Sequence, residues 1–334
     1  GAIARTHLDR IHRSGNLQLV GLADPAPGAQ GLADSLGVPA FADHRQLLDT
    51  VKPQGVIIAT PNQLHWPVAL DCLQRGVAVL VEKPVTDGVP EARLLVEAQE
   101  RTGVPVLVGH HRRHNPIVKR AKAIVESGRL GRLVTAHAQA TFLKPDAYFD
   151  VAWRRQKGGG PILINLIHDI DMLRFLMGEV SSVQAMGSHA VRGFEVEDSA
   201  AAVVRFANGA LGTVLLSDTV TSPWCWDFCA GEQPVYPQQS AQSHFIGGTH
   251  GAMSLPDLAL WNYRGERSWH AEMTREQATV HHQDPYAAQL QHFHDVIVGK
   301  AVPLCSALDG LRTLQATLAV QQAAATGGAV QLQD

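Results

Sequence analysis

The chain has 334 residues, of which 45% are hydrophobic and 18% charged, and its formal net charge is -3. This length allows two domains with substantial cores, and the balanced charge argues against nucleic acid as a partner. No run approaches the roughly 18 apolar residues of a membrane span, and the four cysteines, without a C-x-x-C pair, suggest reduced thiols in a cytoplasmic protein.

Helix and strand patterns alternate over the first 115 residues. The strand runs are continuously apolar, as in Val77–Val81, which indicates a parallel sheet covered on both faces. We therefore expect residues 1–115 to form a doubly wound α/β domain of the Rossmann type. The expected helices are 2–14, 30–36, 46–51, 62–75 and 89–101, and the expected strands are 17–23, 56–59, 77–81 and 106–108.

The start of the chain matches the second half of a dinucleotide-binding fingerprint. Gly1-Ala2-Ile3-Ala4 fits the end of G-x-G-x-x-[GA], without the first glycine and the strand that precedes it. Because that strand is central in a doubly wound sheet, we expect the natural protein to carry roughly ten more residues ahead of Gly1. Gly1, Ala2 and Ile3 are candidate cofactor contacts.

The pattern changes after residue 115. A helix expected at 115–127 is followed by long β-prone runs at 133–141, 183–191, 200–206 and 211–216, and a closing helix is expected at 308–325. Asn208-Gly209 between the last two runs is a strong hairpin signal. We expect residues 116–334 to form an α+β domain with a mostly antiparallel sheet.

Glu82-Lys83-Pro84 follows the strand expected at 77–81. Parallel sheets bind ligands at the carboxyl ends of their strands, so we expect Glu82 and Lys83 to line the cofactor site. The Lys83 ammonium is a candidate for stabilising an alkoxide as a hydroxyl loses its proton. The alternative is a surface lysine at a strand end.

A second segment with candidate catalytic residues follows the triple glycine 158–160. His168 is the candidate general base, since the reference pKa of histidine lies close to neutral pH. Asp171, three positions later, shares its helix face and can orient the imidazole or the substrate. The alternative is a histidine satisfied within the core.

Three earlier loops are candidates for cofactor binding. Asp24 ends the strand expected at 17–23, where an acid accepts hydrogen bonds from ribose hydroxyls and repels a 2′-phosphate. NAD is therefore favoured over NADP, although Asp24-Pro25 can also be read as a turn alone. Thr60, Pro61 and Asn62 follow the strand at 56–59, and Asn62 can equally cap a helix. His65 faces either the ligand or the helix surface.

Trp153, Arg154 and Arg112 are candidate substrate contacts. The guanidinium group of an arginine suits a carboxylate or a densely hydroxylated molecule. Solvated loop arginines are the alternative. The chain's clustered histidines match no standard zinc spacing, so no metal site is expected. Ser222–Gln242, with its aromatic residues, is expected to set substrate specificity.

In these segments the chain resembles the glucose–fructose oxidoreductase / inositol dehydrogenase / rhizopine-catabolism (Gfo/Idh/MocA) superfamily over essentially its whole length. The matching segments are 1–4, 23–25, 60–62 with His65, 82–84, 109–113, 158–160 with 168–171, and 284–286. The resemblance implies a Rossmann domain and a second, substrate-binding domain at 116–334 whose open sheet mediates dimers or tetramers. It also implies a cis Lys83–Pro84 peptide.

The resemblance also implies residue roles. Lys83 becomes the catalytic lysine, His168 the general acid/base and Asp171 a substrate-binding acid. Many members carry an aspartate four positions before the histidine, where this chain has Ile164. The adjacent Asn165 can replace that aspartate in hydrogen bonding but not in proton transfer.

We therefore expect an NAD-dependent dehydrogenase acting on a secondary alcohol of a sugar, cyclitol or sugar acid. Two alternatives stay open. One is a glycoside-cleaving enzyme that oxidises its substrate transiently with tightly held NAD. The other is a non-catalytic, NAD-sensing regulator built on the same scaffold.

Overall fold

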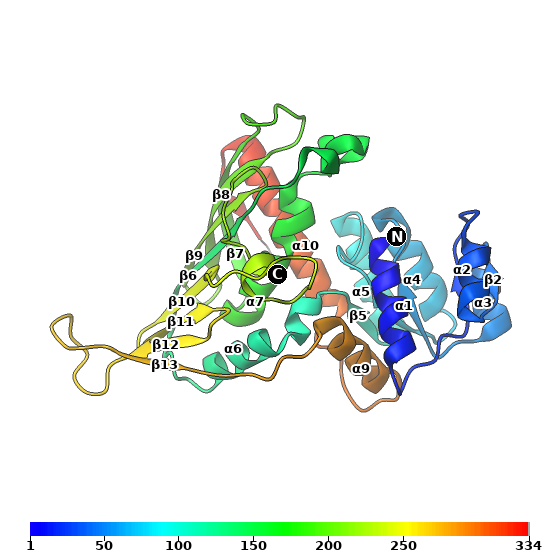
Figure 1. The fold of residues 1–334 in the computed structure, drawn as a ribbon, viewed down its shortest axis with the longest axis horizontal. Helices are drawn as coiled ribbons and strands as arrows, with labels where there is room; N and C mark the ends of the chain where they lie inside the picture. The colour runs from blue at the N-terminus through cyan, green and yellow to red at the C-terminus, as the bar shows by residue number, and fades with distance from the viewer. Residues whose placement is uncertain (333–334) are drawn as a thin grey trace. The chain divides into compact units, whose positions relative to one another are not determined.

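The computed structural model describes residues 1–332, which form two compact units. The first unit comprises Gly1–His114 and Gln283–Leu314, and the second comprises Asn115–His282 and the chain from Gln315 onward. Figure 1 shows the helices and strands of both. Among residues 1–332, no helix has both the length and the apolar character needed to cross a membrane.

The segment Gln283–Leu314 corrects the expected division of the chain, which placed all of 116–334 in the second domain. It belongs to the first unit because its side chains complete the packing there. Phe293 and Ile297 lie directly over Gly55, and Gly310 sits against Val85 and Val108. This return of the chain is a long-range contact, which local sequence patterns do not encode.

The first unit contains parallel strands in two sheets. Strands β3 (Gly55–Ile58), β4 (Ala78–Val81) and β5 (Val106–Val108) pair in that order. Strands β1 (Leu22–Ala23) and β2 (Ala40–Phe41) form a separate pair. No strand pairing joins the two sheets within residues 1–332, and the strand expected ahead of Gly1 stays a prediction.

The strand expected at 17–23 contains only two strand residues. Its single partner is the two-residue β2, so no longer ladder forms in the described chain. The helix expected at 62–75 also differs, because Asn62 lies inside a 3₁₀ turn (η1, Asn62–Leu64) and makes no capping bond in the described residues. The other helices that lie wholly within the first unit are α1 (Ala2–Arg13), α2 (Ala29–Leu36), α3 (His44–Val51), α4 (His65–Leu73), α5 (Val89–Thr102), η2 (His111–His114) and α9 (Pro285–Ile297).

The second unit is built on a nine-stranded sheet in the order β13-β12-β11-β10-β6-β9-β8-β7-β14. Strands β6 and β9 are parallel, and the other neighbours are antiparallel. The strands are β6 (Leu133–Thr141), β7 (Val180–Ser188), β8 (Ser199–Phe206), β9 (Leu211–Ser217), β10 (His244–Gly248), β11 (Gly251–Leu255), β12 (Ala259–Asn262), β13 (Thr274–Gln277) and β14 (Val330–Gln331). The α/β and α+β classes expected for the two parts are confirmed.

One face of this sheet is covered and the other is open. Residues along β8 alternate between buried and exposed, as expected for a sheet with one solvated face. The buried side packs against α6 (Pro116–Glu126), α7 (Ile167–Met177) and the second half of α10 (Ala307–Thr326), as Figure 1 shows. Short turns complete the unit: η3 (Asp146–Asp150), η4 (Ala152–Arg155), the π-helical turn η5 (Ile162–Leu166) and α8 (Trp226–Cys229).

Candidate active site

Lys83 lies directly after β4, a strand whose four residues are all buried. The Lys83–Pro84 peptide is cis, which confirms the expectation from the resemblance. The preceding Glu82 is only 6% exposed, and its Oε2 accepts a hydrogen bond from the Lys83 backbone N–H (3.2 Å). Lys83 itself is half-buried. A rigid strand end and a buried carboxylate therefore position this lysine.

Glu82 is anchored from the other side by α1. His7 Nε2 donates to Glu82 Oε1 at 2.7 Å, and the His7 ring is 2% exposed. A side chain at Gly109 would come within 3.0 Å of the Glu82 backbone. Glycine at 109 therefore lets the chain after β5 pass close to Glu82, the residue before Lys83.

His65 ties two loops of the first unit together. Its ring is 1% exposed, with Nδ1 2.8 Å from the Pro84 oxygen and Nε2 3.0 Å from the Thr60 oxygen. Burial lowers the pKa of His65, while the contacts with the Pro84 and Thr60 carbonyl oxygens act in the opposite direction. This geometry favours a role in shaping the loop of Thr60 rather than direct contact with a cofactor.

The other expected cofactor residues are open to solvent or half-buried. Gly1 and Ala2 are exposed at the start of α1, and Ile3 is half-buried. The first N–H groups of a helix suit a pyrophosphate. Asp24 is exposed, and its Oδ1 accepts the Ala26 N–H (2.9 Å), which is a turn contact. Its second oxygen remains for a ribose hydroxyl. Pro61 is exposed, and Asn62 is half-buried. This unit therefore has backbone N–H donors suited to the pyrophosphate of NAD and a carboxylate suited to its ribose.

In the triple glycine 158–160 of the second unit, backbone conformation or close contacts favour glycine at each position. Gly158 has a φ of +91°, a conformation that favours glycine. A side chain at Gly159 would overlap the Trp153 backbone oxygen, and one at Gly160 would overlap the Glu197 carboxylate. Glu197 Oε1 also accepts the Ile162 N–H (2.9 Å) and thereby holds the start of η5.

Turn η5 leads directly into α7, which carries His168 in its first turn. His168 is half-buried, and Asp171 is 1% exposed. Their spacing of three places them on one helix face. A π-turn inside a helix is frequent at functional sites, and here it ends immediately before the helix of the candidate base. The second unit thus provides an imidazole and a carboxylate on one rigid helix.

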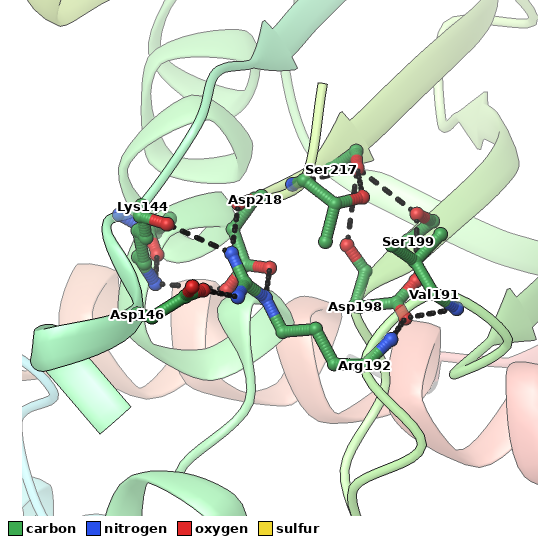
Figure 2. A network of polar contacts seen from close by, with 10 residues as sticks. Lys144, Asp146, Val191, Arg192, Asp198, Ser199, Ser217 and Asp218 are labelled. Carbon is green, nitrogen blue, oxygen red and sulfur yellow. Dashed lines mark hydrogen bonds and ion pairs between the residues drawn. The ribbon is translucent and has the colours of Figure 1, made fainter. Parts of the chain in front are cut away.

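Asn165 lies in the same π-turn and bonds to a residue that the sequence analysis did not single out. Its Oδ1 accepts a hydrogen bond from Lys144 Nζ (2.8 Å). Lys144 Nζ also pairs with Asp218 Oδ2 (3.3 Å), and Arg192 Nε lies 3.2 Å from Asp218 Oδ1. Figure 2 shows Lys144, Arg192 and Asp218 in this network. A Lys-Pro pair shortly after β6, as after β4, is the signal that could have found Lys144.

The expected arginine contacts have different surroundings. Arg112 is only 5% exposed within η2. Arg154 lies over the Tyr148 ring, 3.9 Å from its centroid, and its Nη1 donates to the Tyr148 backbone oxygen (2.7 Å). Trp153 is 51% exposed. Of the three, the Trp153 side chain is the most accessible to a ligand of its unit.

The candidate residues therefore form two sets. Lys83 belongs to the first unit, and Asn165, His168 and Asp171 belong to the second. Their action on one ligand stays a prediction.

Comparisons with known proteins agree with both units. Residues 1–110 match the model of an oxidoreductase family with an NAD-binding Rossmann fold, and residues 118–254 match the GFO/IDH/MocA C-terminal domain. The chain is 28% identical to a 1,5-anhydro-D-fructose reductase of Ensifer adhaerens, over 83% of this chain and 79% of the relative. It is 26% identical to a scyllo-inositol 2-dehydrogenase (NAD(+)) of Bacillus subtilis, over 94% and 89%.

The fold has solved counterparts. The crystal structure of the WlbA dehydrogenase from Bordetella pertussis with NADH and UDP-GlcNAcA has a TM-score of 0.80 and 24% identity, covering 100% of this chain and 97% of that one. The two family models together match most of the chain, with one match in each unit, and the expected motifs lie at the strand and helix ends described above. The chain belongs to the Gfo/Idh/MocA family of NAD-binding oxidoreductases.

Proposed function

We propose that this protein is a dehydrogenase that transfers a hydride between NAD and a secondary alcohol carbon of a sugar, cyclitol or sugar acid. The observation that carries the proposal is Lys83, held by the buried Glu82 at the carboxyl end of a Rossmann strand. The names of the relatives, a sugar-derivative reductase and an inositol dehydrogenase, support this substrate class.

Each candidate residue has a proposed role that follows from its charge and its position. When bound, NAD accepts or supplies the hydride. The start of α1 would receive its pyrophosphate and Asp24 its ribose, with Thr60, Pro61 and Asn62 lining the loop beside Lys83. Lys83 donates a hydrogen bond to the carbinol oxygen and stabilises its developing negative charge. His168 takes the hydroxyl proton, and Asp171 holds a neighbouring hydroxyl.

A substrate screen tests this proposal. Purified protein is mixed with NAD and with polyols, aldoses and sugar acids, and NADH fluorescence is followed. Sustained NADH formation with at least one member is the expected result. Cleavage of a glycoside without accumulating NADH would favour the transient-oxidation mechanism. NAD binding without turnover of any substrate would favour a sensor and contradict the proposal.

We further propose that the open face of the nine-stranded sheet forms the contact of a homodimer or homotetramer. Large apolar side chains are exposed along this sheet, and a hollow lined by Phe245, Trp261 and Thr213 runs across it. These side chains include Val203 48%, Leu211 45%, Leu215 41%, Phe245 45% and Trp261 42%. Such a patch is typical of a protein–protein interface. All four cysteines are buried and lie outside any disulfide bond, which supports the proposal of a reducing, cytoplasmic location.

A further inference from the structure

The side-chain amide of Asn165 has an oxygen that is hydrogen-bonded within the protein and a nitrogen that is available to a ligand. Its Oδ1 accepts the hydrogen bond from Lys144 Nζ (2.8 Å), while its Nδ2 has no hydrogen-bond partner within residues 1–332. Asn165 is half-buried rather than enclosed. An amide held by its oxygen presents its NH₂ group, so this side chain acts toward a ligand as a donor.

Lys144 is itself fixed, so the amide cannot easily turn over. The Lys144 side chain is 9% exposed, and its Nζ lies 3.3 Å from Asp218 Oδ2 and 4.7 Å from the centroid of the Tyr148 ring. Burial lowers the pKa of Lys144, while the neighbouring Asp218 favours its charged form. An ammonium has only donors, so it binds the oxygen of Asn165 and not the nitrogen.

Asp218 is in turn anchored independently of Lys144. It is 1% exposed, and Arg192 binds it through Nε to Oδ1 (3.2 Å) and through Nη2 to its backbone oxygen (2.8 Å). Figure 2 shows this order of contacts. Removal of the Lys144 ammonium therefore leaves the buried carboxylate paired, which lets the role of Lys144 be tested without an uncompensated charge.

Asn165 in η5 and His168 in the first turn of α7 are three residues apart, so their backbones lie within about one turn of each other. We propose that Lys144 is a positioning residue that fixes Asn165 as a hydrogen-bond donor to a substrate oxygen next to the one that His168 deprotonates. This inference rests on the proposed function. It also narrows the substrate to molecules with an acceptor oxygen, a hydroxyl or a carboxylate, beside the reacting carbon.

A double-mutant cycle tests the role of Lys144. The variants are Lys144→Met, Asn165→Ala and their combination, with KM and kcat measured for the best substrate of the screen. Each single variant is expected to raise KM about 10- to 100-fold, the effect of one lost hydrogen bond to a charged or fixed partner. The combined variant is expected to have the KM of Asn165→Ala, because Lys144 acts through that amide.

Lys122→Met is the matched control. Lys122 belongs to the same unit, lies over the Phe175 ring and pairs with Glu126, but it has no contact with Asn165. Its replacement is expected to leave KM unchanged. A merely structural role for Lys144 would lower the thermal midpoint and the active fraction, yet leave the KM of the folded molecules as it was.

Two results would overturn the inference: an unchanged KM in Lys144→Met, or effects of the two substitutions that multiply. If Lys144→Met does not fold, Lys144→Arg retains the charge beside Asp218 but displaces the donor atoms. That variant should raise KM in the unmodified background and leave it unchanged in the Asn165→Ala background. Failure of the unmodified protein to reduce NAD with any substrate contradicts the proposed function and removes this inference with it.

Discussion

Glu82 is a buried carboxylate whose charge is balanced by its neighbours. Burial alone raises the pKa of Glu82, but the hydrogen bond from His7 and the nearby Lys83 and His111 bring that pKa below its ordinary value. Between the lowered value in the folded state and the ordinary value of 4.5, the unfolded chain binds more protons than the folded one. Stability linked to Glu82 is thus fully present above that range and is lost as the pH falls through it.

Glu82→Gln removes this charge and retains the shape of the side chain. We expect the variant to lose about 1–3 kcal/mol of unfolding free energy at neutral pH, the worth of a charged hydrogen bond. The difference from the unmodified protein should shrink as the pH falls below about 4.5. Urea unfolding between neutral and acid pH measures this. Equal stabilities at neutral pH would show that the pair with His7 contributes nothing.

At the level of elements, the junction from the triple glycine through η5 to α7 depends on close backbone contacts. In Gly159→Ala the added methyl group meets the Trp153 backbone oxygen, which cannot move without displacing η4. We expect the free energy of unfolding to fall by about 1–3 kcal/mol, measured by urea unfolding.

Gly31→Ala in α2 is the control for this substitution. No atom lies within 4 Å of an added side chain at Gly31, so alanine should raise the free energy of unfolding by about 0.5–1 kcal/mol through its helix propensity. A Gly159→Ala variant as stable as the unmodified protein would contradict the steric account of the glycine motif.

The sequence predicted some elements well because their signals are local. The apolar run before Glu82 predicts β4 (Ala78–Val81) and so places Lys83, and β6 (Leu133–Thr141) matches its expected range. The link from Lys144 to Asn165 spans 21 residues and is fixed only by the folded core. The π-turn η5 is equally hidden, because one extra residue in a turn leaves no distinct hydrophobic period.

At the level of the whole molecule, the return of Gln283–Leu314 to the first unit could not be predicted. The helix α9 has a clear start, since Asp284 caps it by accepting the Tyr286 N–H (2.8 Å). That local signal does not say which domain the helix joins. The decision depends on a distant partner, the small Gly55 of β3, over which Phe293 and Ile297 fit.

The open sheet face gives a prediction about assembly. Phe245→Glu and Trp261→Glu place charges among exposed apolar side chains, so each should shift the protein from dimers or tetramers toward monomers. Size-exclusion chromatography with light scattering measures the mass. Leu94→Glu is the control, because Leu94 is 45% exposed on α5 of the other unit. An unchanged mass in both sheet variants would exclude this face as the contact.

The central claim is that Lys83 stabilises the negative charge that develops on the carbinol oxygen. It is tested most directly by comparing turnover with NAD affinity in Lys83→Ala. The account predicts a fall in kcat of about 100-fold or more, with a Kd for NAD that changes less than about threefold. Lys300→Ala, an exposed lysine of the same unit, should leave both quantities unchanged. A Lys83→Ala variant with nearly unchanged kcat would contradict the account.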